Sequence, residues 1–264
     1  MRIESPANPR IRAYKSLETG KGRRERDRFQ LEGLSLIEEA RRAGVKLETL
    51  FWCPERAAGH RETAFLASLP PEAEVFEVTE RVLEHMTSTV TPQPIAAEAR
   101  IPGGRLADLA LAEQCLIVAP FETQDPGNLG TMIRTAHAVG AAGLAALGNS
   151  VDPYSPKVVR ATMGSLFHCP VIRRAQPDEF LGWCAANRVE VIAATVYADD
   201  TLYTAGLPPR AALLLGGETQ GLPEELIGPG VTRLAIPMPG GTESLNVAVA
   251  AALMMYEYRR QHPL

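Results

Sequence analysis

Several features are missing from this 264-residue sequence, and each absence narrows its function. There are only four lysines, and none completes a G-x-x-x-x-G-K-[ST] phosphate loop; no G-x-G-x-x-G follows a strand-like run either. These absences argue against a nucleotide or dinucleotide enzyme on a doubly wound fold. Apolar runs such as 138–147 are too short and glycine-rich to span a membrane. The first twelve residues lack the apolar core of a secretory signal, so none is expected.

The cysteines are few and scattered. Cys53, Cys115, Cys169 and Cys184 form no C-x-x-C pair, and no histidine stands at metal-ligand spacing. We therefore predict no zinc or other metal site. The pattern indicates reduced, mostly buried thiols in a cytoplasmic protein.

The remaining composition is that of a globular protein, with 45% hydrophobic and 22% charged residues, in one large domain or two modest ones. The net charge of −4 hides an asymmetry, because residues 1–28 hold nine basic and four acidic side chains. A local basic segment can bind phosphates despite an acidic average. Its central arginines, Arg23, Arg24 and Arg26, are the predicted phosphate contacts, although a solvated, frayed N-terminus has the same composition.

Residues 1–97 read as a small α/β domain. The pattern predicts a basic helix at 8–17 and, within 29–52, a strand, a helix and a second strand. A strand at 74–79 and a helix at 80–86 follow. Residues 98–112 contain a Pro-Gly-Gly run and no strong pattern, so we predict a linker there.

From residue 113 onward, short apolar strands alternate with helices. Strands are predicted at 115–119, 143–147, 189–195, 211–216 and 231–236, and helices near 129–139, 156–163, 177–187 and 245–260. Near-continuous apolar strands between helices favour a parallel sheet covered on both faces. Ligands bind such sheets at the carboxyl ends of the strands, where three glycine-rich loops are predicted, at 120–128, 216–222 and 237–245.

The third of these loops combines the strongest local signals. Prolines and glycines at 237–241 break regular structure after a strand, and an apolar helix pattern follows. Ser244, Leu245 and Asn246 stand at the mouth of that helix, with Ser244 as the predicted N-cap. This geometry suits a pocket for a small polar ligand, or only a strand–loop–helix connection.

The three loops resemble, in order, the three motifs of the SpoU/TrmH family of RNA ribose 2'-O-methyltransferases. The first matches as Asn128-x-Gly-x-x-x-Arg134-x-Ala, the second as Gly216-x-Glu218-x-x-Gly-Leu, and the third as I-P-M-x-G-x-x-x-S-L-N-V from Ile236. Ala248 and His137 depart from the family pattern at neighbouring positions. Residues 1–97 resemble, more weakly, the RNA-binding domain that precedes these catalytic domains.

The resemblance implies an α/β fold with a parallel-sheet catalytic domain at 113–264, a C-terminal trefoil knot and a homodimer. It implies S-adenosylmethionine as methyl donor, bound largely by backbone groups at Gly216, Gly217, Ile236 and Leu245. Because all three loops lie within 113–264, we expect that segment alone to bind the donor. The glycines could instead serve only to make turns.

The residues expected around the acceptor ribose, also by resemblance, are Asn128, Arg134, Glu218, Ser244 and Asn246. A guanidinium rarely gives up its proton, so we favour phosphate binding or alkoxide stabilisation for Arg134 and leave the general base open. Glu218 could equally cap backbone amides of its own loop.

The predicted function is therefore transfer of a methyl group to a ribose 2'-hydroxyl in structured RNA. Ribosomal RNA is favoured over tRNA, because the N-terminal domain resembles the rRNA-modifying branch of the family. A tRNA 2'-O-methyltransferase, or a non-catalytic RNA-binding or ribosome-assembly protein on the same fold, is the alternative. Nothing in the residues identifies the modified nucleotide.

Overall fold

The structure is a computed structural model that describes residues 1–57, 59–196, 198–217 and 221–263. The chain divides into two compact units. Unit 1 comprises Met1–Gly103 and Tyr154–Phe167, and unit 2 comprises Gly104–Pro153 and His168–Leu264. None of the described helices is long and apolar enough to cross a membrane.

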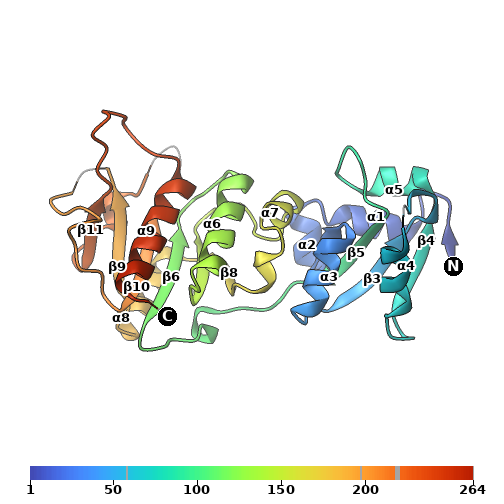
Figure 1. Cartoon of the computed structure of the whole chain (residues 1–264), viewed down its shortest axis with the longest axis horizontal. Helices are drawn as coiled ribbons and strands as arrows, with labels where there is room; N and C mark the ends of the chain where they lie inside the picture. The colour runs from blue at the N-terminus through green and yellow to red at the C-terminus, as the bar shows by residue number, and fades with distance from the viewer. Residues whose placement is uncertain (58, 197, 218–220, 264) are drawn as a thin grey trace. The chain divides into compact units, whose positions relative to one another are not determined.

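Unit 1 is built on a five-stranded mixed sheet with strand order β1-β4-β3-β5-β2 (Figure 1). β1, β4 and β3 are parallel, whereas β5 runs antiparallel to both β3 and β2. Its N-terminal elements are β1 (Arg2–Ile3), α1 (Pro9–Ser16), α2 (Gly20–Arg26), β2 (Arg28–Glu32), α3 (Leu34–Arg42), β3 (Leu47–Trp52), η1 (Pro54–Arg56), α4 (His60–Ala67), β4 (Glu74–Val78), α5 (Glu80–Met86) and β5 (Ile95–Arg100).

Two further elements of unit 1 come from the middle of the sequence. These are α7 (Pro156–Ala161) and the single turn η3 (Ser165–Phe167). The ring of Phe29 on β2 lies 5.0 Å from Tyr154 and 6.3 Å from Phe167, measured between ring centroids. Arg160 of α7 also donates to the Ser88 hydroxyl, with Nη1 and Oγ 2.7 Å apart. A segment within the predicted catalytic domain therefore completes the core of unit 1.

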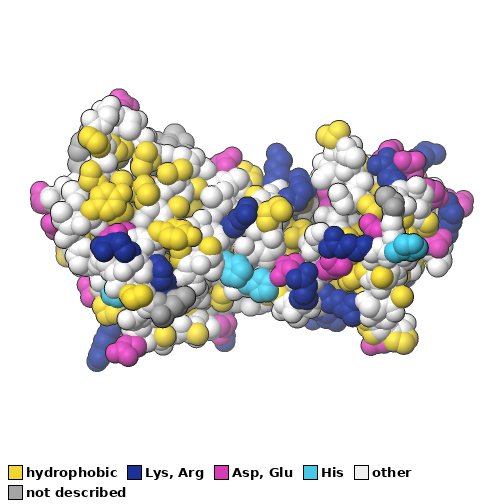
Figure 2. Space-filling model, in the orientation of Figure 1, with side chains coloured by type: hydrophobic (Ala, Val, Ile, Leu, Met, Phe, Trp, Pro, Cys, Tyr) yellow, Lys and Arg dark blue, Asp and Glu magenta, His cyan; other side chains and the backbone are white. Residues whose placement is uncertain are grey.

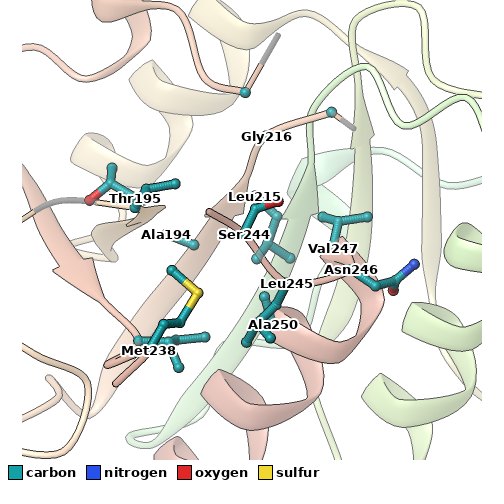
Figure 3. A pocket seen from close by; sticks show the side chains of 14 residues that line it. Ala194, Thr195, Leu215, Gly216, Met238, Ser244, Leu245, Asn246, Val247 and Ala250 are labelled. Atoms are coloured by element: carbon teal, nitrogen blue, oxygen red, sulfur yellow. The ribbon is translucent and has the colours of Figure 1, made fainter. Parts of the chain in front are cut away.

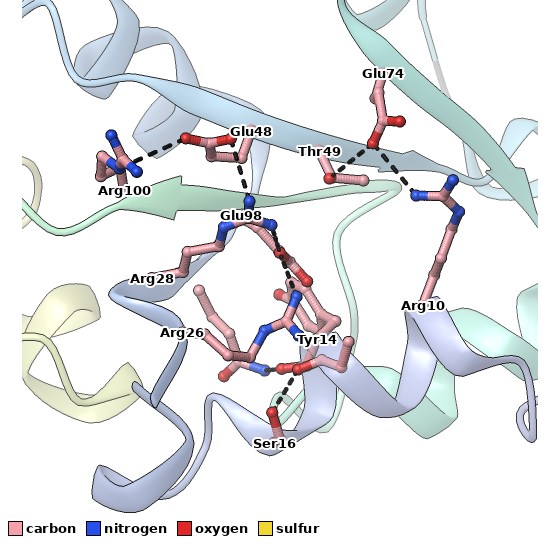
Figure 4. A network of polar contacts seen from close by, with 12 residues as sticks. Arg10, Tyr14, Ser16, Arg26, Arg28, Glu48, Thr49, Glu74, Glu98 and Arg100 are labelled. Atoms are coloured by element: carbon pink, nitrogen blue, oxygen red, sulfur yellow. Dashed lines mark hydrogen bonds and ion pairs between the residues drawn. The ribbon is translucent and has the colours of Figure 1, made fainter. Parts of the chain in front are cut away.

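A polar row crosses the sheet of unit 1 on one face. Gln30, Glu98, Thr49 and Glu74 are cross-strand neighbours on β2, β5, β3 and β4. Glu98 and Gln30 are both 2% exposed, so they require partners within the protein. Figure 4 shows basic side chains of α1, α2 and β2 reaching these carboxylates. Three of the basic side chains of residues 1–28, Arg10, Arg26 and Arg28, are therefore paired with carboxylates of the sheet.

Unit 2 contains a six-stranded sheet with order β11-β9-β10-β6-β7-β8, in which every neighbouring pair is parallel. Its elements are η2 (Leu106–Asp108), β6 (Cys115–Pro120), α6 (Pro126–Ala138), β7 (Gly143–Leu147), β8 (Val171–Ala175), α8 (Pro177–Ala186), β9 (Glu190–Thr195), β10 (Arg210–Leu215), η4 (Glu224–Leu226), β11 (Val231–Ala235) and α9 (Val247–Gln261).

Helices cover both faces of this sheet. On one face, Phe180 and Cys184 of α8 pack into a core with Ile117, Ala119 and their neighbours. On the other face, α6 and α9 lie side by side across β6 and β10 (Figure 1). Successive side chains of β6 point to opposite faces of the sheet, so this strand contributes to the core on each face. This is expected for a strand that is buried on both faces.

The end of α9 is tied firmly to unit 2. The Arg259 guanidinium donates to the carbonyl of Val139 at the end of α6, with Nε and O 2.9 Å apart. Glu257 is buried and bonded to Arg260 and Gln261, which lowers the pKa of its carboxyl to about 2. The amide of Gln261 also donates to the carbonyl of Ala205. These bonds fix the helix whose other end forms the site.

The parallel sheet covered on both faces is confirmed, and so is the small α/β domain before it. Among the described α-helices and strands, sequence patterns missed five: β1, α2, α4, β5 and β8. β5 continues to Arg100, past the predicted domain end at residue 97. The four cysteines are free and buried, as predicted. The division at 97 and 113 and the trefoil knot stay predictions.

Candidate active site

A cavity of about 500 Å³ opens at the carboxyl ends of the central strands of unit 2. We call it the donor cavity, and Figure 3 shows its lining side chains. The walls come from the ends of β9, β10 and β11, the loop after β11 and the first turn of α9. The lining residues are Ala194, Thr195, Val196, Leu215, Gly216, Gly217, Gly221, Ile236, Met238, Ser244, Leu245, Asn246, Val247 and Ala250.

All four residues predicted to bind the donor line this cavity: Gly216, Gly217, Ile236 and Leu245. Ser244 and Asn246, predicted for the acceptor side, also line it. The structure thus brings together residues from the second and third loops. Their roles in binding and catalysis stay predictions.

The two positions that follow β10, 216 and 217, must be glycine because neighbouring backbone atoms leave no room for a Cβ. A Cβ on Gly216 would lie 2.4 Å from the backbone carbon of Gly221. A Cβ on Gly217 would lie 2.8 Å from the carbonyl oxygen of Glu122. Both contacts are too short for any side chain. The turn-making role left open by the sequence is therefore real, and it also keeps this wall of the cavity bare backbone.

The chemistry of the lining suits a small ligand with an apolar ring. Aliphatic and thioether side chains dominate, including Leu215, Ile236 and Met238, and none of the described lining residues is charged. Hydroxyl and amide groups come from Thr195, Ser244 and Asn246. A mostly apolar cavity of a few hundred Å³ with a few polar groups and exposed backbone fits S-adenosylmethionine.

The N-terminus of α9 differs from its predicted form. Asn246, not Ser244, is the N-cap: its Oδ1 accepts from the backbone amides of Ala248 at 2.9 Å and Val249 at 3.3 Å. Ser244 lies two residues earlier and is exposed. Asparagine and serine are comparable N-caps, so residue type alone did not distinguish them.

A side-chain hydrogen bond joins the first and third loops. The Asn246 amide donates to Oδ1 of Asn128, with Nδ2 and Oδ1 2.9 Å apart. Asn128 lies in the first turn of α6, where its backbone amide donates to Oδ1 of Asp125, the N-cap, at 2.8 Å. The N-termini of α6 and α9 are therefore connected through two asparagines that are 118 positions apart in the sequence.

The first loop is held by the loop after β7. The Ser150 hydroxyl accepts from the amide of Thr123 at 3.2 Å and donates to the carbonyl of Leu147 at 2.8 Å. Between these bonds, Glu122 adopts a left-handed conformation with φ of 49°. Such strain persists only where surrounding contacts fix the backbone. This loop is consequently a rigid neighbour of Gly217.

Arg134 lies on α6, outside the lining of the donor cavity. It is exposed, two turns after the helix begins. No hydrogen bond or ion pair joins it to another described residue. Glu218 lies outside the described residues. Of the five predicted acceptor-side residues, Ser244 and Asn246 thus line the donor cavity, and Asn128 is hydrogen-bonded to Asn246.

A groove runs between α6 and α9 beside this site. It is lined by Asn128, Thr131, Asn246, Ala248, Val249, Ala252, Leu253 and Tyr256. Large apolar side chains on its α9 side are open to solvent: Val249 is 49% exposed, Leu253 37% and Tyr256 57%. Figure 2 shows hydrophobic side chains gathered over α9.

The three arginines predicted to bind RNA occupy different environments on α2 of unit 1. Arg23 is only 3% exposed, and its guanidinium donates to the carbonyls of Leu17 at 2.8 Å and Glu18 at 3.0 Å. A buried guanidinium cannot reach a phosphate, so we remove Arg23 from the predicted RNA contacts. Arg24 is exposed, and the Arg26 side chain is 35% exposed, 3.5 Å from Glu98.

Several cavity residues escaped the sequence reasoning. Thr195 is the last residue of β9 and Val196 follows it, at a strand end where the sequence shows none of the three motifs. The rule that ligands bind at strand ends could have identified them. Met238 lies inside the third motif and was passed over. Val247 and Ala250 are on the first turn of α9, where apolar residues look like ordinary helix core.

Comparisons with known proteins agree with this geometry. The model of the SpoU rRNA methylase family matches residues 115–256, and that of an MRM3-like substrate binding domain matches residues 8–97. The chain is 34% identical over 258 residues to the Bacillus subtilis 23S rRNA (guanosine(2553)-2'-O)-methyltransferase RlmP. That alignment covers 97% of this chain and 98% of the relative.

Solved structures give the same result. An AdoMet-bound rRNA methyltransferase from Sinorhizobium meliloti has a TM-score of 0.89 and 34% identity, covering 100% of this chain and 98% of that one. The SpoU methyltransferase AviRb from Streptomyces viridochromogenes, in complex with the cofactor AdoMet, has a TM-score of 0.90 and 28% identity. That match covers 96% of this chain and 98% of AviRb.

Proposed function

The chain belongs to the SpoU rRNA methylase family, and we propose that it transfers a methyl group from S-adenosylmethionine to a ribose 2'-hydroxyl of ribosomal RNA. One observation carries the proposal. The second and third loops form a single cavity of suitable size and polarity, and the Asn128–Asn246 hydrogen bond connects it to the first loop.

S-adenosylmethionine would be held in the donor cavity and would supply an activated methyl group. Bare backbone at Gly216 and Gly217 allows close approach of a ligand. Leu215, Ile236 and Met238 provide apolar surface for its adenine, and Thr195 and Ser244 provide hydroxyl groups. Exclusion of water from this apolar space favours reaction with RNA rather than solvent.

Arg134 would act on the acceptor. Its exposed guanidinium can form a charge-assisted, bidentate hydrogen bond with a phosphate or stabilise a developing alkoxide. Neither role requires the guanidinium to lose its proton. The hydrogen bond between Asn128 and Asn246 connects α6 to the donor cavity, and both residues would lie between the two substrates.

Ribosomal RNA is the proposed substrate class. RlmP is named as a 23S rRNA methyltransferase, and this chain covers nearly all of its length, including the N-terminal domain. In unit 1 we propose Arg24 and Arg26 as phosphate contacts, because their side chains reach solvent. Arg23 has a structural role instead.

We further propose that the protein acts as a homodimer in the cytoplasm, where its four buried thiols stay reduced. The occupant of the α6–α9 groove would be a second copy of this chain. Exposed Val249, Leu253 and Tyr256 form the kind of apolar surface that monomers rarely leave open. Sedimentation should give about twice the 28.5 kDa chain mass, and Leu253→Glu should give monomers. Tyr203→Glu, at an exposed position outside the groove, is the control.

The decisive experiment uses the full chain with tritiated S-adenosylmethionine. Ribosomal RNA and tRNA, isolated from cells lacking the gene, serve as parallel substrates. We expect label in rRNA, at a single ribose, located by mapping 2'-O-methylation. Label only in tRNA would transfer the proposal to that substrate, and donor binding without methylation of any RNA would favour a non-catalytic RNA-binding protein.

A further inference from the structure

Four basic side chains gather at one end of the sheet of unit 1. We call them the basic cluster: Arg26, Arg28, Lys46 and Arg100. Arg28 on β2 and Arg100 on β5 are direct cross-strand partners. The amide of Arg100 donates to the carbonyl of Lys46, just before β3, with N and O 2.9 Å apart. Three adjacent strands, about 4.8 Å apart, thus bring basic residues side by side.

Two carboxylates hold the basic cluster from within (Figure 4). The nearest nitrogen of Arg28 lies 2.9 Å from an oxygen of Glu98, and that of Arg26 lies 3.5 Å from it. Glu48 lies 3.3 Å from Arg28 and forms ion pairs of 3.2 Å and 3.8 Å with the other two members. The side chains of Glu98 and Glu48 are only 3% and 14% exposed, so the negative charge lies inside and the positive charge outside.

The basic cluster keeps a net positive charge. Four cations stand against two carboxylates, which leaves a net charge of +2. The exposed Asp27 is adjacent in sequence and makes no ion pair with a described residue, and the balance stays positive even when it is counted. By contrast, Arg61 elsewhere in unit 1 is paired one to one with Glu38.

This arrangement is unfavourable for the sheet itself. Like charges directly opposite each other on neighbouring strands are destabilising, and Arg28 faces Arg100 in this way. Glu48 contacts both arginines and offsets only part of the repulsion. The side chains of Lys46 and Arg100 are 65% and 59% exposed, so the excess charge is open to solvent. A local conflict of this kind is typical of a functional site.

We propose that the basic cluster is a binding site for backbone phosphates of the RNA, which adds Arg28, Lys46 and Arg100 to the contact already proposed for Arg26. The inference rests on the proposed function, which supplies RNA as the ligand. A guanidinium has five N–H donors, and the carboxylates occupy one on Arg26 and two on Arg28. The remaining donors suit phosphate oxygens. Such contacts position the RNA and do not read its sequence.

The salt dependence of rRNA binding tests this site, with the full chain and rRNA isolated from cells lacking the gene. Arg100→Ala and Lys46→Ala remove the two most exposed members of the basic cluster. Each should reduce the slope of log affinity against log salt concentration by about 0.7–0.9, and the double variant by about twice that. Arg61→Ala is the matched control, because its side chain is 61% exposed, and it should leave the slope unchanged.

Thermal unfolding separates binding from a structural role. Because Arg100→Ala relieves the repulsion with Arg28, its melting temperature should match or exceed that of the wild type. An unchanged slope in both variants, or an equal reduction in Arg61→Ala, would overturn the inference alone. If the wild type shows the expected slopes but transfers no methyl group, the basic cluster is supported and the proposed function fails. A wild-type chain that does not bind rRNA would overturn both.

Discussion

Arg23 and Arg24 are adjacent on α2, yet replacing them should affect different properties of the protein. Arg23→Ala removes a buried guanidinium that donates to the carbonyls of Leu17 and Glu18. Hydrogen bonds to a charged group contribute roughly 1.5–3 kcal/mol each, and a buried carbonyl left without a donor adds a penalty. Because Glu18 is exposed, water can replace its bond, and we expect a total loss of about 2–4 kcal/mol.

A loss of that size should lower the melting temperature of unit 1 by about 5–15 °C. Arg24→Ala should leave the stability within about 0.5 kcal/mol, since its side chain is exposed and makes no hydrogen bond or ion pair with another described residue. Thermal unfolding followed by circular dichroism measures both variants.

RNA binding should respond in the opposite way. In a plot of log affinity against log salt concentration, each lost phosphate contact reduces the slope by about 0.7–0.9. We expect this reduction for Arg24→Ala and no reduction for Arg23→Ala, measured below its melting temperature. A flatter slope for Arg23→Ala with unchanged stability would refute the assignment, as would an unchanged slope for Arg24→Ala.

Three further outcomes follow from the site and its supports. Arg134→Ala should keep donor affinity, measured by calorimetry, and slow single-turnover methyl transfer by about 10²–10³-fold; a wild-type rate would show that Arg134 is only a surface residue. Gly216→Ala should abolish donor binding because its Cβ would meet backbone at 2.4 Å, whereas Gly182→Ala, with nothing within 4 Å on α8, should retain it. The carboxyl of Glu257 has a pKa of about 2 instead of 4.5, so its stabilisation is complete above pH 4.5 and is lost as pH falls toward 2. Glu257→Gln should therefore flatten the acid dependence of the melting temperature, and an unchanged acid dependence would contradict this.

The parallel sheet was predictable because its strands are buried on both faces and are therefore almost entirely apolar. β7 and β10 are examples, with every residue of Gly143–Leu147 buried. β8 was missed because Val171–Ala175 contains two arginines and lies at the edge of the sheet. α2 was missed because Gly20–Arg26 has glycine and charge where an amphipathic helix would show an apolar stripe.

The site was predictable wherever a residue type determines the chemistry. The glycines predicted at 216 and 217 do line the donor cavity, and only glycine tolerates the close backbone contacts found there. Burial of Arg23 was not predictable, because charge suggests exposure and its partners are backbone carbonyls with no sequence signature. Likewise, only the fold brings Asn128 and Asn246 into contact.

The segment 154–167 changes how the catalytic half should be studied. By sequence it lies within the family match at 115–256, but in the structure it packs in unit 1, with Tyr154 and Phe167 against Phe29. A chain that begins at residue 113 would keep these two aromatic rings and lose the ring that covers them. It would expose apolar surface that is buried in the full chain, with a corresponding tendency to aggregate. Failure of such a fragment to bind S-adenosylmethionine would then report on its folding, so donor affinity has to be measured on the full chain.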